Sequence, residues 1–114
     1  IRPDLATEEC LQYLKSAGCF LVGMSIETAN DYLRNEVLKK NISREQIITA
    51  AKLTKQYKIK LMTLNMIGIP FGSLEDDLDT LRFNILCRPD YTVTVLFSII
   101  KMQIYIMLCL RILG

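Results

Sequence analysis

The stretch LMTLNMIGIPFGSLED, residues 61–76, is apolar until it reaches Gly68, Pro70 and Gly72. Its first part is apolar without alternation, which is typical of a strand buried on both faces in a parallel sheet. Ser73 can then cap a helix through its hydroxyl, and the acidic side chains that follow are favourable in the first turn of a helix. A plain connection needs one turn residue, and this one has three within five positions. We therefore expect something to approach this backbone closely.

Helices and strands alternate on both sides of this stretch. Apolar runs predict strands over residues 19–27, 59–67 and 91–100. Apolar stripes predict helices over residues 7–17, 30–40, 43–53 and 73–85, three of which have a predicted cap: Thr7, the pair Ser43 and Gln46, and Ser73. Strands that alternate with helices favour right-handed crossovers and a parallel sheet. The predicted fold class is therefore α/β, with parallel strands alternating with helices, as in a slice of a barrel or of a doubly wound fold.

The composition excludes several classes of function. The chain has 114 residues, a net charge of +2 and interspersed charges, so it lacks the basic surface of a nucleic-acid-binding protein. It has no His, the commonest general base and metal ligand. Cys10, Cys19, Cys87 and Cys109 have no metal-binding spacing, and no signal peptide precedes them, so we expect reduced thiols in a cytoplasmic protein. Because Ile1 lies at a strand-to-helix junction, we interpret the chain as part of a longer protein.

The end of the chain is unusually apolar. Residues 91–110 are long enough to cross a bilayer, although their first half is the third strand that the pattern requires. The remainder has no turn, no cap and no clear period. We therefore predict one domain over residues 1–98 and an irregular apolar tail over residues 99–114, which we interpret as a non-native or truncated end rather than a membrane helix.

Two predicted strand ends carry groups that could meet a ligand, because ligands of parallel α/β proteins bind beyond the carboxyl ends of the strands. Alternation places Ser25 and Glu27 on one face, where the carboxylate could accept hydrogen bonds from a diol or an amine. An exposed Glu27 that simply precedes the next helix is an equal alternative. At the next strand end, Asn65 needs buried partners, and Gly68 and Pro70 could leave main-chain groups open to a flat heterocycle. On pattern alone, a wide strand-to-helix loop is the favoured interpretation there.

Three longer stretches together resemble a known family. They are RPDLATEECLQYLKSAGC, VGMSIETANDYLRNEVLKKNISREQIITAAKL and NMIGIPFGSLED, at residues 2–19, 22–53 and 65–76. Their order and spacing resemble the second half of the radical SAM core domain. The closest likeness is to the clade with an upstream cobalamin-binding domain, such as the anaerobic magnesium-protoporphyrin IX monomethyl ester cyclase type. The resemblance extends over residues 1–98.

The resemblance implies a fold, cofactors and a set of site residues. The fold is part of a (β/α)6 TIM-type barrel, and the cofactors are S-adenosylmethionine and a [4Fe–4S] cluster that together generate a 5′-deoxyadenosyl radical. Ser25 and Glu27 would meet the ribose and the amino acid end of S-adenosylmethionine, and the backbone from Asn65 to Pro70 would pack against the adenine. The residues assigned to cofactor binding in this way are Arg2, Ser25, Glu27, Asn65, Ile67, Gly68 and Pro70.

The chain also departs from the family pattern. The family's Pro-Gly-Glu-Thr is represented by Pro70–Ser73, so the usual acidic residue is missing. The cluster-ligating C-x-x-x-C-x-x-C run is expected upstream of Ile1, and this chain alone is therefore predicted to be inactive. An unidentified small-molecule substrate, an electron donor and a cobalamin are expected for the longer protein. The alternative is a degenerate, non-catalytic α/β module that binds a nucleoside or a partner.

Overall fold

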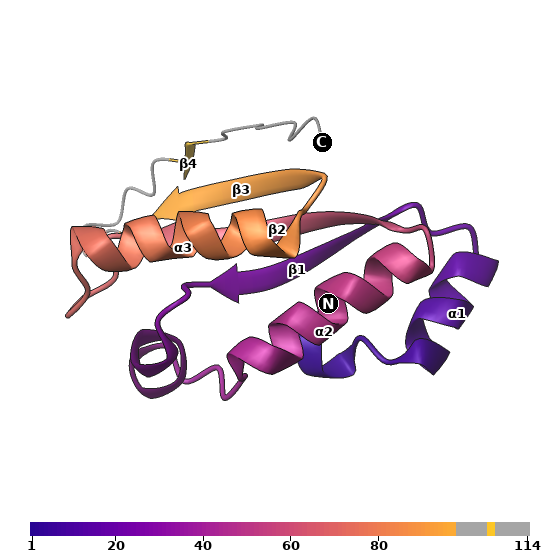
Figure 1. The fold of residues 1–114 in the computed structure, drawn as a ribbon, viewed down its shortest axis with the longest axis horizontal. Coiled ribbons are helices and arrows are strands. Elements are labelled where there is room, and N and C mark those ends of the chain that lie inside the picture. The colour runs from indigo at the N-terminus through magenta and orange to yellow at the C-terminus, as the bar shows by residue number, and fades with distance from the viewer. Residues whose placement is uncertain (98–104, 107–114) are drawn as a thin grey trace.

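The chain forms a sheet with its helices on one face, as a computed structural model describes it for residues 1–97 and 105–106 (Figure 1). The strands are β1 (Leu21–Glu27), β2 (Lys60–Ile67), β3 (Tyr91–Leu96) and β4 (Tyr105–Ile106). The helices are α1 (Glu8–Ser16), α2 (Arg44–Gln56) and α3 (Leu74–Cys87), with a 3-10 turn η1 (Pro3–Leu5) and a π-helical turn η2 (Leu33–Val37). Strands β1, β2 and β3 are parallel and adjacent in that order, and β4 pairs antiparallel with β3. The predicted α/β class is confirmed.

Side-chain caps fix the residues at which the three α-helices begin. The Thr7 hydroxyl accepts a backbone N–H from the first turn of α1. Ser43 and Gln46 form a reciprocal capping box at α2, and Ser73 forms one with Asp76 at α3. Each cap satisfies a backbone donor that the helix itself leaves unpaired and contributes about 1 kcal/mol. The capping residues predicted from the sequence are confirmed at all three helices.

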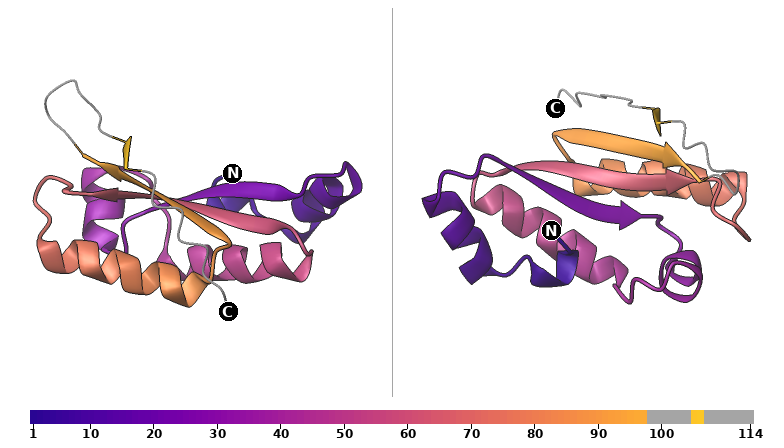
Figure 2. Two further views of the ribbon diagram at one scale, coloured as in Figure 1. Left: turned by 90° about the horizontal axis from the view of Figure 1, so that it is seen from above. Right: turned by 180° about the vertical axis from the view of Figure 1, so that it is seen from behind.

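The hydrophobic core lies between the sheet and its helices. Figure 2 shows α2 and α3 on the same face of the strands. Met24 and Leu61 from the sheet are fully buried there against Ile47 of α2 and Phe83 of α3. The alternate positions of β1 and β2 are half-buried, so the prediction of strands buried on both faces is wrong for this part of the chain. The reason is that the described helices cover one face only.

The segment after β1 differs from its prediction. The sequence predicts a helix over residues 30–40, and the structure contains a shorter one: residues 31–32 are α-helical and continue into the π-helical turn η2, which ends at Val37. The Leu38 N–H donates to the Leu33 carbonyl at 2.9 Å, a wider turn than that of an α-helix. Lys39 and Asn41 then adopt left-handed backbone conformations, with φ of 55° and 53°. These conformations end the helix before the position that its apolar stripe predicts.

A buried arginine explains why the chain turns there. Arg34 is 1% exposed. Its Nε donates to the Ile42 carbonyl at 2.7 Å, its Nη1 donates to the Thr28 carbonyl at 2.8 Å, and its Nη2 pairs with Asp31. The guanidinium therefore joins the end of β1 to the segment that enters α2. A helix continued to residue 40 would carry the Ile42 carbonyl away from it.

Part of the predicted architecture falls at the end of the chain. Residues 98–100 of the predicted third strand, the domain boundary at residue 98 and most of the apolar tail over residues 99–114 lie outside the described residues. Within the tail, Tyr105 and Ile106 pair with Val95 and Thr94. None of the helices in the described part of the chain is long and apolar enough to cross a membrane. The tail and the domain boundary remain predictions.

Candidate functional site

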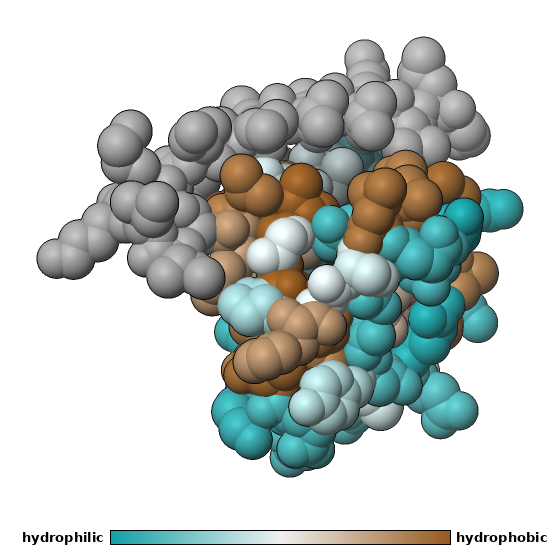
Figure 3. Space-filling model, turned by 90° about the vertical axis from the view of Figure 1, so that its left-hand side faces the viewer, coloured by the Kyte–Doolittle hydropathy of each residue, from teal (hydrophilic) through white to brown (hydrophobic). Residues whose placement is uncertain are grey.

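The parallel strands bring their carboxyl ends to one edge of the sheet. β1 ends at Glu27, β2 at Ile67 and β3 at Leu96, and all three run in the same direction. Figure 3 views the molecule from this end and shows apolar side chains gathered at its centre, with hydrophilic ones below and to the right. The residues assigned to cofactor binding on β1 and those on β2 therefore lie at the same edge. This edge is the candidate site.

The end of β1 is irregular at the two residues that the sequence singled out. Ser25 is half-buried and is paired with Leu64, whereas Glu27 is buried and is paired with Asn65. From Ser25 to Glu27, β1 therefore moves on by two residues while β2 moves on by one, and Glu27 adopts a left-handed φ of 65°. A bulge of this kind redirects the side chain that follows it. The simple alternation that predicts a common face for Ser25 and Glu27 does not hold here.

The Glu27 carboxylate is enclosed and paired with a lysine. Glu27 is 7% exposed, which contradicts the alternative of an exposed residue before a helix. Its Oε1 lies 3.1 Å from Nζ of Lys40, whose side chain is 40% exposed. The Lys40 carbonyl accepts a hydrogen bond from Nη2 of Arg2 at 3.2 Å, and Arg2 also pairs with Asp4 at 3.0 Å. Lys40 thus connects Arg2 with Glu27, although Arg2 itself is exposed.

The two glycines after β2 are required by the packing of the chain itself. Gly68 has a φ of +68°, and a Cβ added to it would lie 3.1 Å from Cδ1 of Leu96. Its N–H donates to both carboxylate oxygens of Asp77 at 3.3 Å. A Cβ on Gly72 would lie 3.0 Å from Cδ1 of Leu33. The loop therefore has a structural reason for its glycines, and Gly68, whose N–H is paired with Asp77, is exposed just after the end of β2.

Phe71 occupies a backbone conformation that suits glycine. Its φ is 68°, and its side chain is 88% exposed, so it gains little from burial. We expect Phe71→Gly to raise the free energy of unfolding by about 0.5–1 kcal/mol, because a left-handed conformation is strained for a residue with a Cβ. Urea denaturation of both chains measures the difference. Phe20 is 75% exposed and has no left-handed backbone, so Phe20→Gly should be destabilising. A lower free energy of unfolding in Phe71→Gly would contradict the claim that the backbone at Phe71 is strained.

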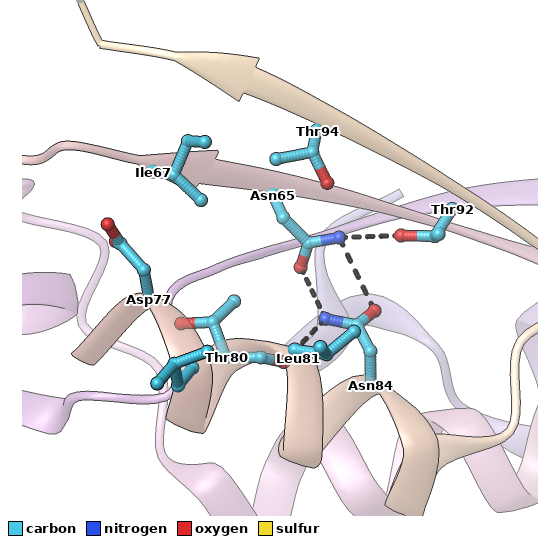
Figure 4. A pocket seen from close by; sticks show the side chains of 9 residues that line it. Asn65, Ile67, Asp77, Thr80, Leu81, Asn84, Thr92 and Thr94 are labelled. Carbon is cyan, nitrogen blue, oxygen red and sulfur yellow. Dashed lines mark hydrogen bonds between the residues drawn. The ribbon is translucent and has the colours of Figure 1, made fainter. Parts of the chain in front are cut away.

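Asn65 has the buried partners that the sequence required. It is 4% exposed, and its Nδ2 donates to Oγ1 of Thr92 at 2.8 Å (Figure 4). Nδ2 of Asn84 donates to Oδ1 of Asn65 at 2.8 Å, and the Thr63 hydroxyl donates to Oδ1 of Asn84 at 2.6 Å. These bonds hold α3 against β2 and β3. The Asn65 side chain consequently faces the helices, and only its backbone could contribute at the strand ends.

Ile67 and Pro70 complete the set of residues assigned to cofactor binding. Ile67 is half-buried and lines a cavity of about 220 Å³ between the sheet and α3, beside Leu78 and Leu81. This cavity is on the same face as Asn65, as Figure 4 shows. Pro70 is half-buried in the loop between β2 and α3. The structure therefore brings Glu27, Gly68 and the adjoining backbone to one edge, while the side chains of Asn65 and Ile67 point toward the helices.

The described residues do not form a metal site. They contain no group of three or more His, Cys, Asp or Glu side chains placed to hold an ion. Burial raises the pKa of the Cys87 thiol to about 11, with a partial offset from Arg44 and Lys55. A cluster ligand must be a thiolate, and Cys87 is therefore poorly suited to that role. Cys10 and Cys19 lie in α1 and before β1, away from the carboxyl edge of the sheet.

Comparison with known proteins identifies the family. No curated protein matches the chain. Among solved structures, coproporphyrinogen III oxidase (HemN) from Escherichia coli, a radical SAM enzyme, superposes with a TM-score of 0.78 at 15% identity. The match covers 86% of this chain but 23% of that enzyme, so it shows a shared fold over part of a longer protein. The family model of the Radical SAM superfamily matches residues 1–83. The chain belongs to the radical SAM superfamily.

Proposed function

We propose that the carboxyl edge of β1 and β2 binds S-adenosylmethionine and that this chain is the cofactor-binding part of a radical SAM enzyme. The observation that carries the proposal is that a buried carboxylate, Glu27, ends β1, while an exposed left-handed peptide, Gly68, directly follows the adjacent strand β2. A carboxylate in such an environment forms strong hydrogen bonds with hydroxyl or ammonium groups. A peptide without a side chain allows a planar ring to approach closely.

The residues at this edge fit different parts of the cofactor. Glu27 and Ser25 would hold the ribose hydroxyls and the amino acid end, and the backbone from Gly68 to Pro70 would lie against the adenine. Lys40 pairs with Glu27 and is 40% exposed, so its ammonium group can move into solvent when a ligand takes over the carboxylate. Arg2 is a further candidate for the carboxylate of the ligand. With one electron from a reduced [4Fe–4S] cluster, bound S-adenosylmethionine would supply the 5′-deoxyadenosyl radical that abstracts hydrogen from the substrate, and methionine would be the other product.

The remaining components are proposed to belong to a longer protein. We propose that the ligands of the [4Fe–4S] cluster come from a C-x-x-x-C-x-x-C run upstream of Ile1 and that the isolated 114-residue chain is inactive. A cobalamin-binding domain, the likeness to the cyclase clade, an electron donor, a small-molecule substrate and a cytoplasmic location are proposed on the residue resemblance and composition alone. Specificity for the substrate is expected to come from other loops and domains.

Replacing Glu27 tests the proposed pocket. We expect Glu27→Ala to weaken the binding of S-adenosylmethionine to the 114-residue chain by about 1–3 kcal/mol, the scale of a lost charged hydrogen bond. Isothermal titration calorimetry measures the affinity. The matched control is Glu36→Ala, because Glu36 is an exposed glutamate that pairs only with Lys39 at 3.8 Å among the described residues. If Glu27→Ala and the unchanged chain bound S-adenosylmethionine with equal affinity, Glu27 would not be part of the proposed pocket.

The second candidate function is a non-catalytic module that binds a nucleoside. The observation that favours it is the loop at Pro70–Ser73, where a strained and exposed Phe71 is found and the family's acidic residue is missing. The two functions are separated with a longer chain that includes the upstream cysteine run, reconstituted with iron and sulfide. Incubation with S-adenosylmethionine and dithionite should release 5′-deoxyadenosine from a radical SAM enzyme. A chain that binds the cofactor without this product would be the non-catalytic module.

A further inference from the structure

The first turn of α3 touches the loops that leave both β1 and β2. Oδ1 of Asp76 accepts a hydrogen bond from Nδ2 of Asn30 at 2.8 Å, and Asn30 lies three residues beyond the end of β1. Oδ2 of Asp76 accepts the Ser73 N–H at 2.8 Å and the Ser73 hydroxyl at 3.0 Å. Ser73 is the last residue of the loop that leaves β2. One carboxylate therefore connects the two loops that would form the cofactor site.

The hydrogen bonds leave Asn30 only one orientation. A carboxylate can only accept, so the amide group of Asn30 must turn its NH2 toward Asp76. Its Oδ1 then accepts the Leu33 N–H at 3.0 Å, which begins η2. The hydrogen bond from Asn30, followed by those from Ser73, lowers the pKa of the Asp76 carboxyl below its ordinary value. Asp76 consequently stays ionised at neutral pH and determines how the amide of Asn30 points.

A second contact supports the same connection. The Thr80 hydroxyl, one turn along α3, accepts the Ala29 N–H at 3.0 Å and lies 3.3 Å from Oγ1 of Thr28. Thr28 and Thr80 are both buried. The segment that follows Glu27 is therefore attached to α3 at two successive turns, whereas α3 begins directly after the loop that contains Gly68. The position of the segment after Glu27 relative to the Gly68 loop therefore depends on its contacts with α3.

We infer that Asp76 is a positioning residue, which through Asn30 holds the Glu27 side of the cofactor site in register with the Gly68 side. The inference rests on the proposed function, and it concerns a residue that touches no ligand. Its consequence is that the affinity for S-adenosylmethionine depends on which member of the Asn30–Asp76 pair donates and which accepts. This effect is separate from the role of Asp76 in capping α3.

An exchange of the two side chains tests this inference. In Asp76→Asn the new amide has only one oxygen, so its NH2 group must face either the NH2 group of Asn30 or the Ser73 N–H, both of which are donors. In Asn30→Asp two carboxylates meet. In the double variant Asn30→Asp/Asp76→Asn, the carboxylate now at position 30 can accept from the Leu33 N–H and from the amide now at position 76. The oxygen of that amide can still accept the Ser73 N–H. We expect each single variant to bind S-adenosylmethionine about tenfold more weakly, the equivalent of one charged hydrogen bond. The double variant should recover to within about twofold of the unchanged chain.

A control separates positioning from helix capping. Ser73→Ala removes the cap hydroxyl of α3 and leaves the Asn30–Asp76 bond intact, so it should lower the melting temperature without changing the affinity. An affinity loss in Ser73→Ala equal to that in Asp76→Asn would overturn the inference, because loss of the cap alone would then explain both. Failure of the double variant to recover affinity would overturn it as well.

Hydrogen exchange distinguishes failure of this inference from failure of the proposed function. If the unchanged chain binds no S-adenosylmethionine, the proposed function fails. The positioning role is then measured in the ligand-free chain as amide exchange in residues 28–33. Faster exchange there in Asp76→Asn, with recovery in the double variant and none of this change in Ser73→Ala, supports the inference. Unchanged exchange in Asp76→Asn overturns it.

Discussion

Replacing Arg34 with methionine is expected to lower the free energy of unfolding by about 3–5 kcal/mol. Methionine fills much of the same space, so most of the loss comes from hydrogen bonding. The carbonyls of Thr28 and Ile42 each lose a charged donor in a buried location, and an unsatisfied buried acceptor costs about 1–3 kcal/mol. Asp31 adds little, because its side chain is 67% exposed and can be solvated. Urea denaturation measures the change.

The control for this prediction is another paired arginine. Arg82 contacts Glu75 at 2.7 Å and Asp79 at 2.6 Å, but its side chain is 60% exposed. Exposed ion pairs contribute little to stability, so Arg82→Met should leave the unfolding midpoint almost unchanged. A similar effect of the two substitutions would show that burial of Arg34 is not what makes it important. Arg34→Lys should fall between the unchanged chain and Arg34→Met, because lysine keeps the charge without the planar fork.

Gly68→Val is expected to abolish measurable binding of S-adenosylmethionine and to lower the free energy of unfolding by about 2–4 kcal/mol. Valine is strained at a φ of +68°, and its side chain would meet Leu96 at the end of β3. The sequence alone predicts only that Gly68 leaves main-chain groups open to a flat heterocycle, which a valine side chain would cover. The structure adds strain and a clash within the chain, so Gly68→Val acts on stability and on binding together.

A second glycine separates these two effects. Gly18 follows α1 with a φ of +85°, and a Cβ there would have no neighbour within 4 Å among the described residues. Gly18→Val should therefore lose about 1–3 kcal/mol through strain alone and keep its affinity for the ligand. Calorimetric titration below the unfolding temperature of both variants makes the comparison. If folded Gly68→Val bound S-adenosylmethionine with normal affinity, this loop would not be part of the cofactor site.

Most of the fold could be predicted from local patterns. The α/β class and the starts of α1, α2 and α3 followed from apolar runs and from caps at Thr7, Ser43 and Ser73, because these signals act within a few residues of the chain. The resemblance to the radical SAM core was likewise a property of ordered motifs, and the superfamily is shown by the match over residues 1–83. The assignment of individual site residues to the cofactor remains a prediction.

The sequence by itself determined that helices and strands alternate, where the helices begin and which strand ends carry Glu27 and Gly68. Only the tertiary structure decided that the helix after β1 is shortened and becomes π-helical, that the Asn65 side chain faces α3 and that Asp76 joins the two loops. The physical reason is range. Caps and periodicity depend on neighbours along the chain. Asn65 bonds to Asn84 and Thr92, and Asp76 bonds to Asn30, across separations of 19, 27 and 46 residues, so these groups meet only when the sheet and α3 pack together.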